Sequence, residues 1–307
     1  MAEPGPRRFR AALARGRPLL LDAAMGTRLV ARGLDLARDD PCLWTLDRPD
    51  DVLAVHRRDV AAGSDALLTN TFGANRRTLA RLGRPDAVVE INRRAVALAR
   101  QAAGADRFVL GSIGPQAVDD VDATREQVLA LTEAGADALL LETHTRHEAR
   151  TRLELLRGEV APPVVVSIIE TGELPGKPAG WAKGQAWADS WLGRKGGACA
   201  YGTNCHDLEA TLRLIERLAH DASAPLIAQP SAGLPGPPLA GPEAFAAAVP
   251  RLLALGVRLL GGCCGTTEAH VAALRAALDR VPVAQASDNA DAIRSPLPEG
   301  EGSGQYR

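Results

Sequence analysis

The fold is decided by short apolar runs such as ALLLE at residues 138–142, which precedes a segment with helical spacing at residues 146–157. A run that is apolar at almost every position is typical of a strand buried on both faces, whereas a half-exposed strand alternates. Seven more runs of this kind lie at residues 19–22, 66–69, 108–112, 164–168, 198–203, 226–229 and 258–262. The sequence therefore predicts eight buried strands.

Segments with helical spacing alternate with these runs. Besides residues 146–157, they cover residues 52–62, 87–103, 125–134, 184–193, 207–220, 242–255 and 268–279. Several start beside residues that favour the first turn of a helix, such as Asp51, Asp86, Thr124 and Thr267. Eight strands that alternate with eight helices over roughly 270 residues predict an α/β protein with the (β/α)8 TIM-barrel fold in a single domain.

An open, doubly wound sheet would show the same alternation. The number of strands favours the barrel, and no G-x-G-x-x-G follows the first run, which argues against a dinucleotide-binding sheet. We expect the barrel at residues 19–283, an N-terminal extension at residues 1–18 and a disordered C-terminal tail at residues 284–307, where Pro and Gly replace the apolar periodicity. A Gly/Pro-rich stretch at residues 171–182 predicts a long loop over one end of the barrel.

The composition argues against several classes of protein. The 307 residues carry a formal net charge of -1, so the basic excess of a dedicated nucleic-acid-binding protein is missing. No apolar run reaches the about 18 residues of a transmembrane helix, and no apolar segment follows the N-terminal arginines as in a secretory signal. We therefore expect a cytoplasmic protein without a nucleic-acid or membrane partner, and the sequence leaves its oligomeric state open.

The loops that follow the carboxyl ends of the strands form the active site of such a barrel. Three of the five cysteines, Cys205, Cys263 and Cys264, fall at these positions. Three thiolates suit Zn²⁺, and three protein ligands leave one coordination position open, as in catalytic zinc sites. The adjacent pair needs a sharp backbone bend, which the neighbouring glycines permit. Buried free thiols and a vicinal disulfide are the alternatives, but the position of Cys205 at the end of a second strand favours a metal.

Other side chains that could ligate a metal are interpreted differently. His144 and His206 also fall on this rim, where a single histidine more often makes a hydrogen bond, so both are predicted to be non-ligands. Cys42 and Cys199 are interpreted as ordinary buried or half-buried thiols.

Two carboxylates, Asp22 and Glu142, end the first and fourth predicted strands. A carboxylate at such a position can cap a helix or organise a loop. Beside a zinc site, however, it is well placed to hold the ammonium group of a substrate, and this is the role we predict for both.

Seven motifs on the predicted rim follow one another in the order LDAAMGT (21–27), TNTF (69–72), GSIGP (111–115), ET (142–143), TNC (203–205), PSAG (230–233) and GGCCGTT (261–267). Together they resemble the homocysteine S-methyltransferase family, over about residues 19–279. GGCCGTT with an upstream Asn-Cys is the specific part of this resemblance. It implies a zinc ion held by Cys205, Cys263 and Cys264.

The resemblance also implies a substrate site. It predicts substrate-binding roles for six residues, namely Asp22, Ala24, Met25, Asn70, Ser112 and Glu142. The two carboxylates would contact the substrate ammonium, and backbone N–H groups near Ala24 and Met25 would meet its carboxylate.

The implied activity is zinc-dependent transfer of a methyl group from a small-molecule donor to the thiol of homocysteine, which gives methionine. The donor would be S-methylmethionine, S-adenosylmethionine, betaine or a methyl-corrinoid. One barrel accounts for almost the whole of this sequence, so no cobalamin or folate domain is expected within it. Two alternatives are a methyltransferase component that acts with a separate corrinoid protein on another thiol, and a non-catalytic zinc- or thiol-binding barrel.

Three positions depart from the pattern of the family. Ala23 stands where the family usually has Gly, Ser231 where it often has Asn, and Gln229 where Tyr is frequent. The methyl group of Ala23 is expected to intrude on a loop near the substrate. Ser231 leaves the fourth ligand of the resting metal open.

Overall fold

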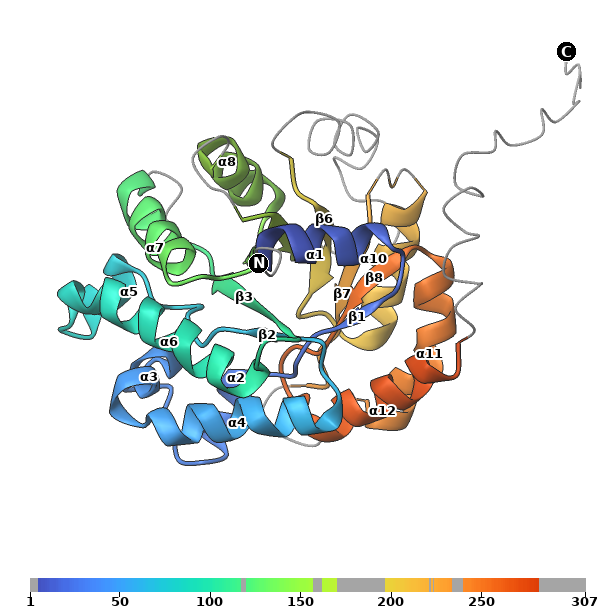
Figure 1. Cartoon of the computed structure of the whole chain (residues 1–307), viewed down its shortest axis with the longest axis horizontal. Helices are drawn as coiled ribbons and strands as arrows, with labels where there is room; N and C mark the ends of the chain where they lie inside the picture. The colour runs from blue at the N-terminus through green and yellow to red at the C-terminus, as the bar shows by residue number, and fades with distance from the viewer. Residues whose placement is uncertain are drawn as a thin grey trace, which may run out of the picture.

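The computed structural model describes residues 5–116, 120–156, 162–169, 197–220, 222, 224–233 and 240–281. Within these residues eight parallel strands form one sheet in the order β1-β8-β7-β6-β5-β4-β3-β2 (Figure 1). The strands are β1 (Leu19–Leu20), β2 (Ala66–Leu68), β3 (Phe108–Ile113), β4 (Ala138–His144), β5 (Val164–Ile168), β6 (Ala200–Asn204), β7 (Leu226–Gln229) and β8 (Val257–Leu260). Each overlaps one predicted run, and the (β/α)8 barrel is confirmed.

Two aspartate side chains help to join β1 to β2, the two ends of the sheet. The Leu20 N–H donates to Asp65 Oδ2 at 2.9 Å, and the Asp65 N–H donates to the Leu20 carbonyl at 2.7 Å. Closer to the carboxyl ends of the two strands, the Leu68 N–H donates to Asp22 Oδ2 at 2.9 Å. These bonds nearly close the barrel, and they make Asp22 part of the closure.

The longer helices outside the barrel match the predicted segments to within a few residues. They are α4 (Pro49–Ala62), α6 (Val88–Ala103), α7 (Val121–Glu133), α8 (Arg146–Leu156), α10 (Leu208–Ala219), α11 (Pro242–Ala254) and α12 (Glu268–Asp279). Local chemistry sets their starts. Pro49 occupies the first turn of α4, which therefore begins before the predicted residue 52. Asp207 Oδ1 accepts the Ala210 N–H at 2.7 Å, and Thr267 forms a capping box with His270.

Several short elements were not predicted, because segments of three to six residues are too short to show a periodic pattern. They are α2 (Met25–Val30), α3 (Trp44–Asp47), α5 (Arg76–Arg81) and the 3₁₀ helices η1 (Pro41–Leu43) and η2 (Pro85–Ala87). The predicted helix at residues 184–193, the loop at 171–182 and the tail at 284–307 lie outside the described residues.

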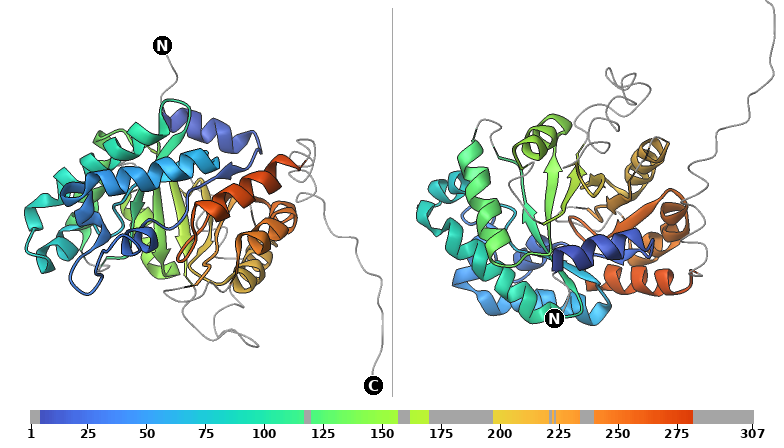
Figure 2. Two further views of the ribbon diagram at one scale, coloured as in Figure 1. Left: turned by 90° about the horizontal axis from the view of Figure 1, so that it is seen from below. Right: turned by 45° about the horizontal axis from the view of Figure 1, so that its top comes forward.

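Helix α1 (Gly5–Ala14) covers the end of the barrel at which the strands begin (Figures 1 and 2). Phe9 and Leu13 are buried there in one cluster with side chains of the strands, such as Leu19 and Phe108. The rings of Phe9 and Phe108 meet edge to face, with centroids 5.3 Å apart. The residues predicted as an N-terminal extension therefore contain a helix that completes the inner core.

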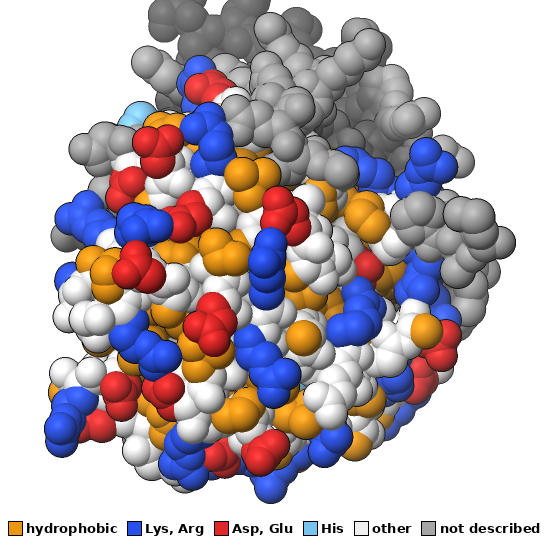
Figure 3. Space-filling model, turned by 60° about the vertical axis from the view of Figure 1, so that its left-hand side comes forward, with side chains coloured by type: hydrophobic (Ala, Val, Ile, Leu, Met, Phe, Trp, Pro, Cys, Tyr) orange, Lys and Arg blue, Asp and Glu red, His pale blue; other side chains and the backbone are white. Residues whose placement is uncertain are grey.

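The outer surface carries charges of both signs. On the face turned forward in Figure 3, basic and acidic side chains are interspersed. Ion pairs join neighbouring outer helices, such as Arg93 to Glu133 at 2.8 Å between α6 and α7. In the part of the chain that the structure describes, no helix combines the length and the apolar character needed to cross a membrane.

Candidate metal and substrate site

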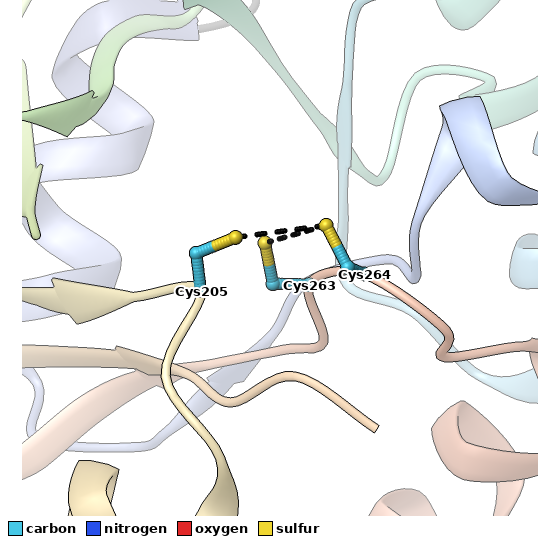
Figure 4. Close-up of side chains that lie close together, drawn as sticks. All are labelled: Cys205, Cys263 and Cys264. Carbon is cyan, nitrogen blue, oxygen red and sulfur yellow. Dashed lines mark hydrogen bonds between the residues drawn. The ribbon is translucent and has the colours of Figure 1, made fainter. Parts of the chain in front are cut away.

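Three cysteine sulfurs converge at the end of the barrel opposite α1. Cys205 directly follows β6, and Cys263 and Cys264 lie in the loop after β8. Cys264 Sγ lies 3.5 Å from Cys205 Sγ and 4.0 Å from Cys263 Sγ, and all three sulfurs lie within 4.8 Å of one another (Figure 4). A tetrahedral zinc ion with Zn–S bonds of about 2.3 Å separates its sulfur ligands by roughly 3.8 Å. The spacing and the chemistry of this donor set therefore fit a zinc ion.

The loop after β8 bends sharply enough to turn adjacent cysteines toward one point. Gly265 has φ of 77°, a conformation that favours glycine, and a Cβ there would collide with the Gly233 carbonyl. The Cys263 carbonyl accepts the Thr266 hydroxyl at 2.7 Å and closes the turn. Cys205 itself has φ of 63°, which costs a non-glycine residue energy. The thiols are therefore held in place by the backbone.

The three thiols share protons unequally. Hydrogen bonds from Cys205 and Cys263 lower the pKa of Cys264 to about 3. The pKa of Cys263 is raised, because its thiol donates to the other two sulfurs and because it is buried. The cluster therefore favours negative charge on Cys264, with protons of the neighbouring thiols directed at it, and a divalent cation could replace those protons.

Glu142 lies on β4, beside Ser112 of β3. Its Oε1 accepts the Ser112 hydroxyl at 2.9 Å. Burial raises the pKa of Glu142 to about 7, although the hydrogen bond from Ser112 lowers it, and the negative charge of Cys264 raises it further. This carboxylate lies close enough to the sulfur cluster to respond to its charge.

The residue after Glu142 is held by Asn204, which precedes Cys205 in the chain. Thr143 has φ of 63°, an outlier for a β-branched residue. Its N–H donates to Asn204 Oδ1 at 3.1 Å, and its hydroxyl accepts from Asn204 Nδ2 at 2.7 Å. One amide side chain thus ties the end of β4 to the end of β6.

Asp22 is almost completely buried, with 3% of its surface exposed. Burial raises its pKa well above the usual value, and the charge of Asp59 adds to the shift. Its Oδ2 already accepts the Leu68 N–H, so a substrate would use the other oxygen.

The remaining predicted substrate-binding residues differ in how many of their hydrogen-bonding groups already have partners within the protein. The Ala24 N–H donates to the Thr266 hydroxyl at 3.1 Å, and Met25 follows at the start of α2. Asn70 Nδ2 donates to the Pro41 carbonyl at 2.7 Å and to the Thr45 hydroxyl at 3.2 Å. Both amide hydrogens of Asn70 are therefore used, and its Oδ1 is the group left for a substrate.

The other candidate ligands stay out of the sulfur cluster. Among the described residues, Cys205, Cys263 and Cys264 form the one group of three that could hold a metal. His144 is fully buried, its Nδ1 lies 3.0 Å from the Glu142 carbonyl, and burial lowers its pKa to about 4. Cys42 and Cys199 are separate free thiols, and Cys263 and Cys264 form no disulfide.

The sequence profile described as homocysteine S-methyltransferase matches residues 19–278. This chain belongs to that family. Methionine synthase of Mycobacterium tuberculosis (strain ATCC 25618 / H37Rv) is 32% identical over 305 residues, which cover 86% of this chain and 25% of that protein. The chain thus spans about a quarter of the length of that relative.

Two further relatives are comparable in length to this chain. Homocysteine S-methyltransferase YbgG of Bacillus subtilis (strain 168) is 26% identical, over 82% of this chain and 92% of its own. The metallated form of the homocysteine methyltransferase MmuM from Escherichia coli superposes with a TM-score of 0.73 at 29% identity, over 87% of this chain and 99% of that one. These similarities extend over almost the whole described barrel.

The three departures from the pattern of the family fit the structure without disrupting the sulfur cluster. The side chain of Ala23 is 5% exposed and packs in the hydrophobic core. The Ser231 hydroxyl donates to the Cys264 carbonyl at 3.1 Å and accepts the Gly233 N–H at 3.1 Å. The Oε1 of Gln229 is buried and has no hydrogen-bond partner among the described residues. The Ser231 side chain is therefore committed to supporting the cysteine loop.

Sequence reasoning overlooked three residues that organise this site. Asn204 is an amide directly before a rim cysteine in the TNC motif, and this position is the signal in the sequence that points to it. Thr266 contacts the loop of residues 22–25 across the fold, whereas Arg28 contacts it from the adjoining helix α2 and is itself bound to Asp59 on α4. For Arg28 the available signal was a charge placed among the apolar residues of the LDAAMGTRLV segment.

Proposed function

We propose that this protein transfers a methyl group to the thiol of homocysteine and so forms methionine. The observation that carries the proposal is the cluster of three cysteine sulfurs, 3.5 and 4.0 Å apart, on the catalytic rim of the barrel. The names of YbgG and MmuM support the same acceptor.

Cys205, Cys263 and Cys264 would hold a zinc ion. When bound, zinc would lower the pKa of a coordinated thiol, so that the thiol would be deprotonated near neutral pH, where a free alkyl thiol is largely protonated. Three protein thiolates around a divalent cation leave a net charge of about -1. A site with this negative charge would keep a bound substrate sulfur electron-rich, and it would activate water poorly. Because the ligands must stay reduced, we propose the cytoplasm as the compartment.

The chain's own residues bind and orient the amino acid. Glu142 and the free oxygen of Asp22 would accept hydrogen bonds from the substrate ammonium, and the bond from Ser112 would hold Glu142 in place. The substrate carboxylate would lie beside Ala24 and meet the N–H of Met25, since the Ala24 N–H already donates to the Thr266 hydroxyl. Asn70 would offer its carbonyl oxygen. Holding both ends of the amino acid would direct its thiol toward the cysteine cluster.

The methyl donor is a small molecule in the favoured version of this proposal. The negative charge of the sulfur-rich site would attract a cationic donor, such as S-methylmethionine, S-adenosylmethionine or betaine. A second candidate is a component that receives the methyl group from a separate methyl-corrinoid protein. The 32% identity to one quarter of a longer methionine synthase supports a barrel that acts as one component of a larger system.

A donor panel tests the proposal. Zinc-loaded protein would be incubated with homocysteine and, in parallel, with S-methylmethionine, S-adenosylmethionine, betaine and methylcobalamin, and methionine would be measured. We expect methionine from at least one cationic donor, whereas turnover with methylcobalamin alone would favour the corrinoid version. If the zinc-loaded protein gave no methionine with any donor, the proposed enzyme activity would be wrong, and a non-catalytic zinc- or thiol-binding role would be favoured.

A further inference from the structure

Arg28 on α2 lies beneath the loop that contains Ala24 and Met25, and it is 4% exposed. Its guanidinium donates to Asp59 Oδ1 at 2.7 Å and to Asp59 Oδ2 at 2.6 Å, which makes a bidentate buried pair with α4. The same group also donates to the Ala23 carbonyl at 2.9 Å and to the Ala24 carbonyl at 3.0 Å. Arg28 therefore binds two consecutive carbonyls and a carboxylate at once.

These contacts fix the direction of two peptide groups. In a trans peptide the carbonyl and the N–H of the following residue point in opposite directions. Arg28 holds the carbonyl of the peptide between Ala23 and Ala24, while the Thr266 hydroxyl accepts the N–H of that peptide. Arg28 also holds the Ala24 carbonyl, which turns the Met25 N–H away from the guanidinium.

The same loop is bonded to the cysteine loop. The Gly262 N–H donates to the Asp22 carbonyl at 3.2 Å, and the Gly265 N–H donates to the Thr27 hydroxyl at 3.1 Å. The Thr266 hydroxyl that accepts the Ala24 N–H itself donates to the Cys263 carbonyl. The orientation of residues 23–25 is therefore set relative to the sulfur cluster.

Stability alone does not require this ion pair. Asp59 is fully buried, and replacing a buried ion pair with apolar residues of similar size is often neutral or stabilising. What apolar residues cannot replace is the pair of hydrogen bonds to the carbonyls of Ala23 and Ala24.

We infer that Arg28, held by Asp59, is a positioning residue that fixes the loop of residues 22–25 relative to the sulfur cluster, so that this loop can hold the amino-acid end of the substrate. This inference rests on the proposed function. It concerns the binding of the amino-acid end of the acceptor, and it assigns Arg28 no contact with the substrate.

The test uses variants that separate positioning from charge burial. Arg28→Met with Asp59→Leu removes both buried charges and leaves no unpaired ion, whereas Arg28→Lys keeps the charge but cannot hold the carboxylate and both carbonyls. Arg100→Met is the matched control, since Arg100 forms a 2.6 Å ion pair with Asp137 at the opposite end of the barrel. All variants would be measured for zinc content, kinetics and hydrogen exchange of the backbone in residues 21–27.

We expect the double variant to keep its fold and its zinc. Its KM for homocysteine should rise about 10- to 100-fold, because a misplaced contact of this kind costs up to about 10²-fold, while kcat changes less than about threefold. Amide exchange in residues 21–27 should accelerate. Arg28→Lys should recover part of both effects, and Arg100→Met should behave like the wild type.

A folded double variant with the wild-type KM, or with unchanged exchange in residues 21–27, would overturn the inference. If the double variant does not fold, Arg28→Lys decides by the same two measurements. Failure of the proposed function would look different, because the wild type itself would form no methionine. Calorimetric binding of homocysteine and hydrogen exchange would then still decide whether Arg28 positions the loop.

Discussion

The two ends of the barrel are built from different chemistry. The end where the strands begin is closed by α1, whose Phe9 and Leu13 are buried against apolar strand residues. The other end holds the sulfur cluster, the buried Asp22 and the partly buried Glu142, and desolvation raises the pKa values of both carboxylates. It also holds the two non-glycine residues with positive φ in the described chain, Thr143 and Cys205.

This difference separates stability from function within one fold. Burial of aromatic and aliphatic side chains stabilises the closed end. At the open end, each residue with unfavourable φ costs of order 1–3 kcal/mol, and each partly dehydrated carboxylate costs more when it is ionised. The closed end therefore offsets the energetic cost of a pre-arranged site about one strand length away.

The largest expected effect comes from removing metal ligands at the open end of the barrel, the end that holds the three cysteines. Changing both Cys263 and Cys264 to Ala should remove most bound zinc, and methyl transfer should fall by about 10³-fold or more. The reasons are that a free thiol is only a few per cent ionised near neutrality and that a displaced thiol loses its orientation. Elemental analysis and the methionine assay check this. Cys42→Ala, away from the cluster, is the control, and full zinc occupancy in the double variant would contradict the assignment of ligands.

The closed end should respond in the opposite manner. Phe9→Ala removes a fully buried ring that packs edge to face against Phe108 and should destabilise the protein by about 3–5 kcal/mol, measured by urea denaturation. Zinc content and KM of the folded fraction should not change. Leu36→Ala, at a side chain that is 58% exposed, should change stability by less than about 0.5 kcal/mol. Loss of zinc in Phe9→Ala would show that the two ends are coupled.

A smaller effect is expected within the open end itself. Glu142→Ala should weaken homocysteine binding by about 1.5–3 kcal/mol, the scale for a hydrogen bond to a charged group, with zinc content unchanged. A simple thiol that lacks the amino group should lose little affinity in the same variant. If calorimetry found wild-type affinity for homocysteine, or if the zinc were lost, Glu142 would not be the ammonium-binding group.

The smallest effect tests the energetic cost of the open end. The pKa of Glu142 is raised to about 7 in the folded protein, so the folded state binds its proton more tightly than the unfolded state does. Stability that comes from the protonated form is therefore present at low pH and is lost as the pH rises through 7. In metal-free protein, Glu142→Gln should stabilise by about 1–2 kcal/mol more at pH 8 than at pH 5, after allowance for partial exposure to solvent. Glu154→Gln, on the surface of α8, is the control and should show no such difference. Equal effects of Glu142→Gln at pH 5 and pH 8 would show that the ionised Glu142 carboxylate does not destabilise the fold.

Local patterns account for most of what was predicted correctly. The runs at residues 164–168 and 226–229 match β5 and β7 residue for residue, because a strand buried on both faces must be apolar along its whole length. The segment at residues 268–279 matches α12 in the same way, since Thr267 marks its start. The short helix α2 and the helix α1 were missed, since a single turn shows no period and α1 lies before the repeating pattern begins.

The sequence by itself determined the strands, the rim to which the three cysteines belong, and the family whose motifs they carry, because each of these follows from local periodicity or from spacing along the chain. Only the tertiary structure decided which hydrogen-bonding groups on that rim are already bonded to other parts of the protein. It assigned one oxygen of Asp22 to a backbone N–H 46 residues away and paired Arg28 with Asp59 across 31 residues. The physical reason is that a hydrogen-bonding group is either committed or free depending on which partner the fold brings within about 3 Å, and local sequence does not specify that partner.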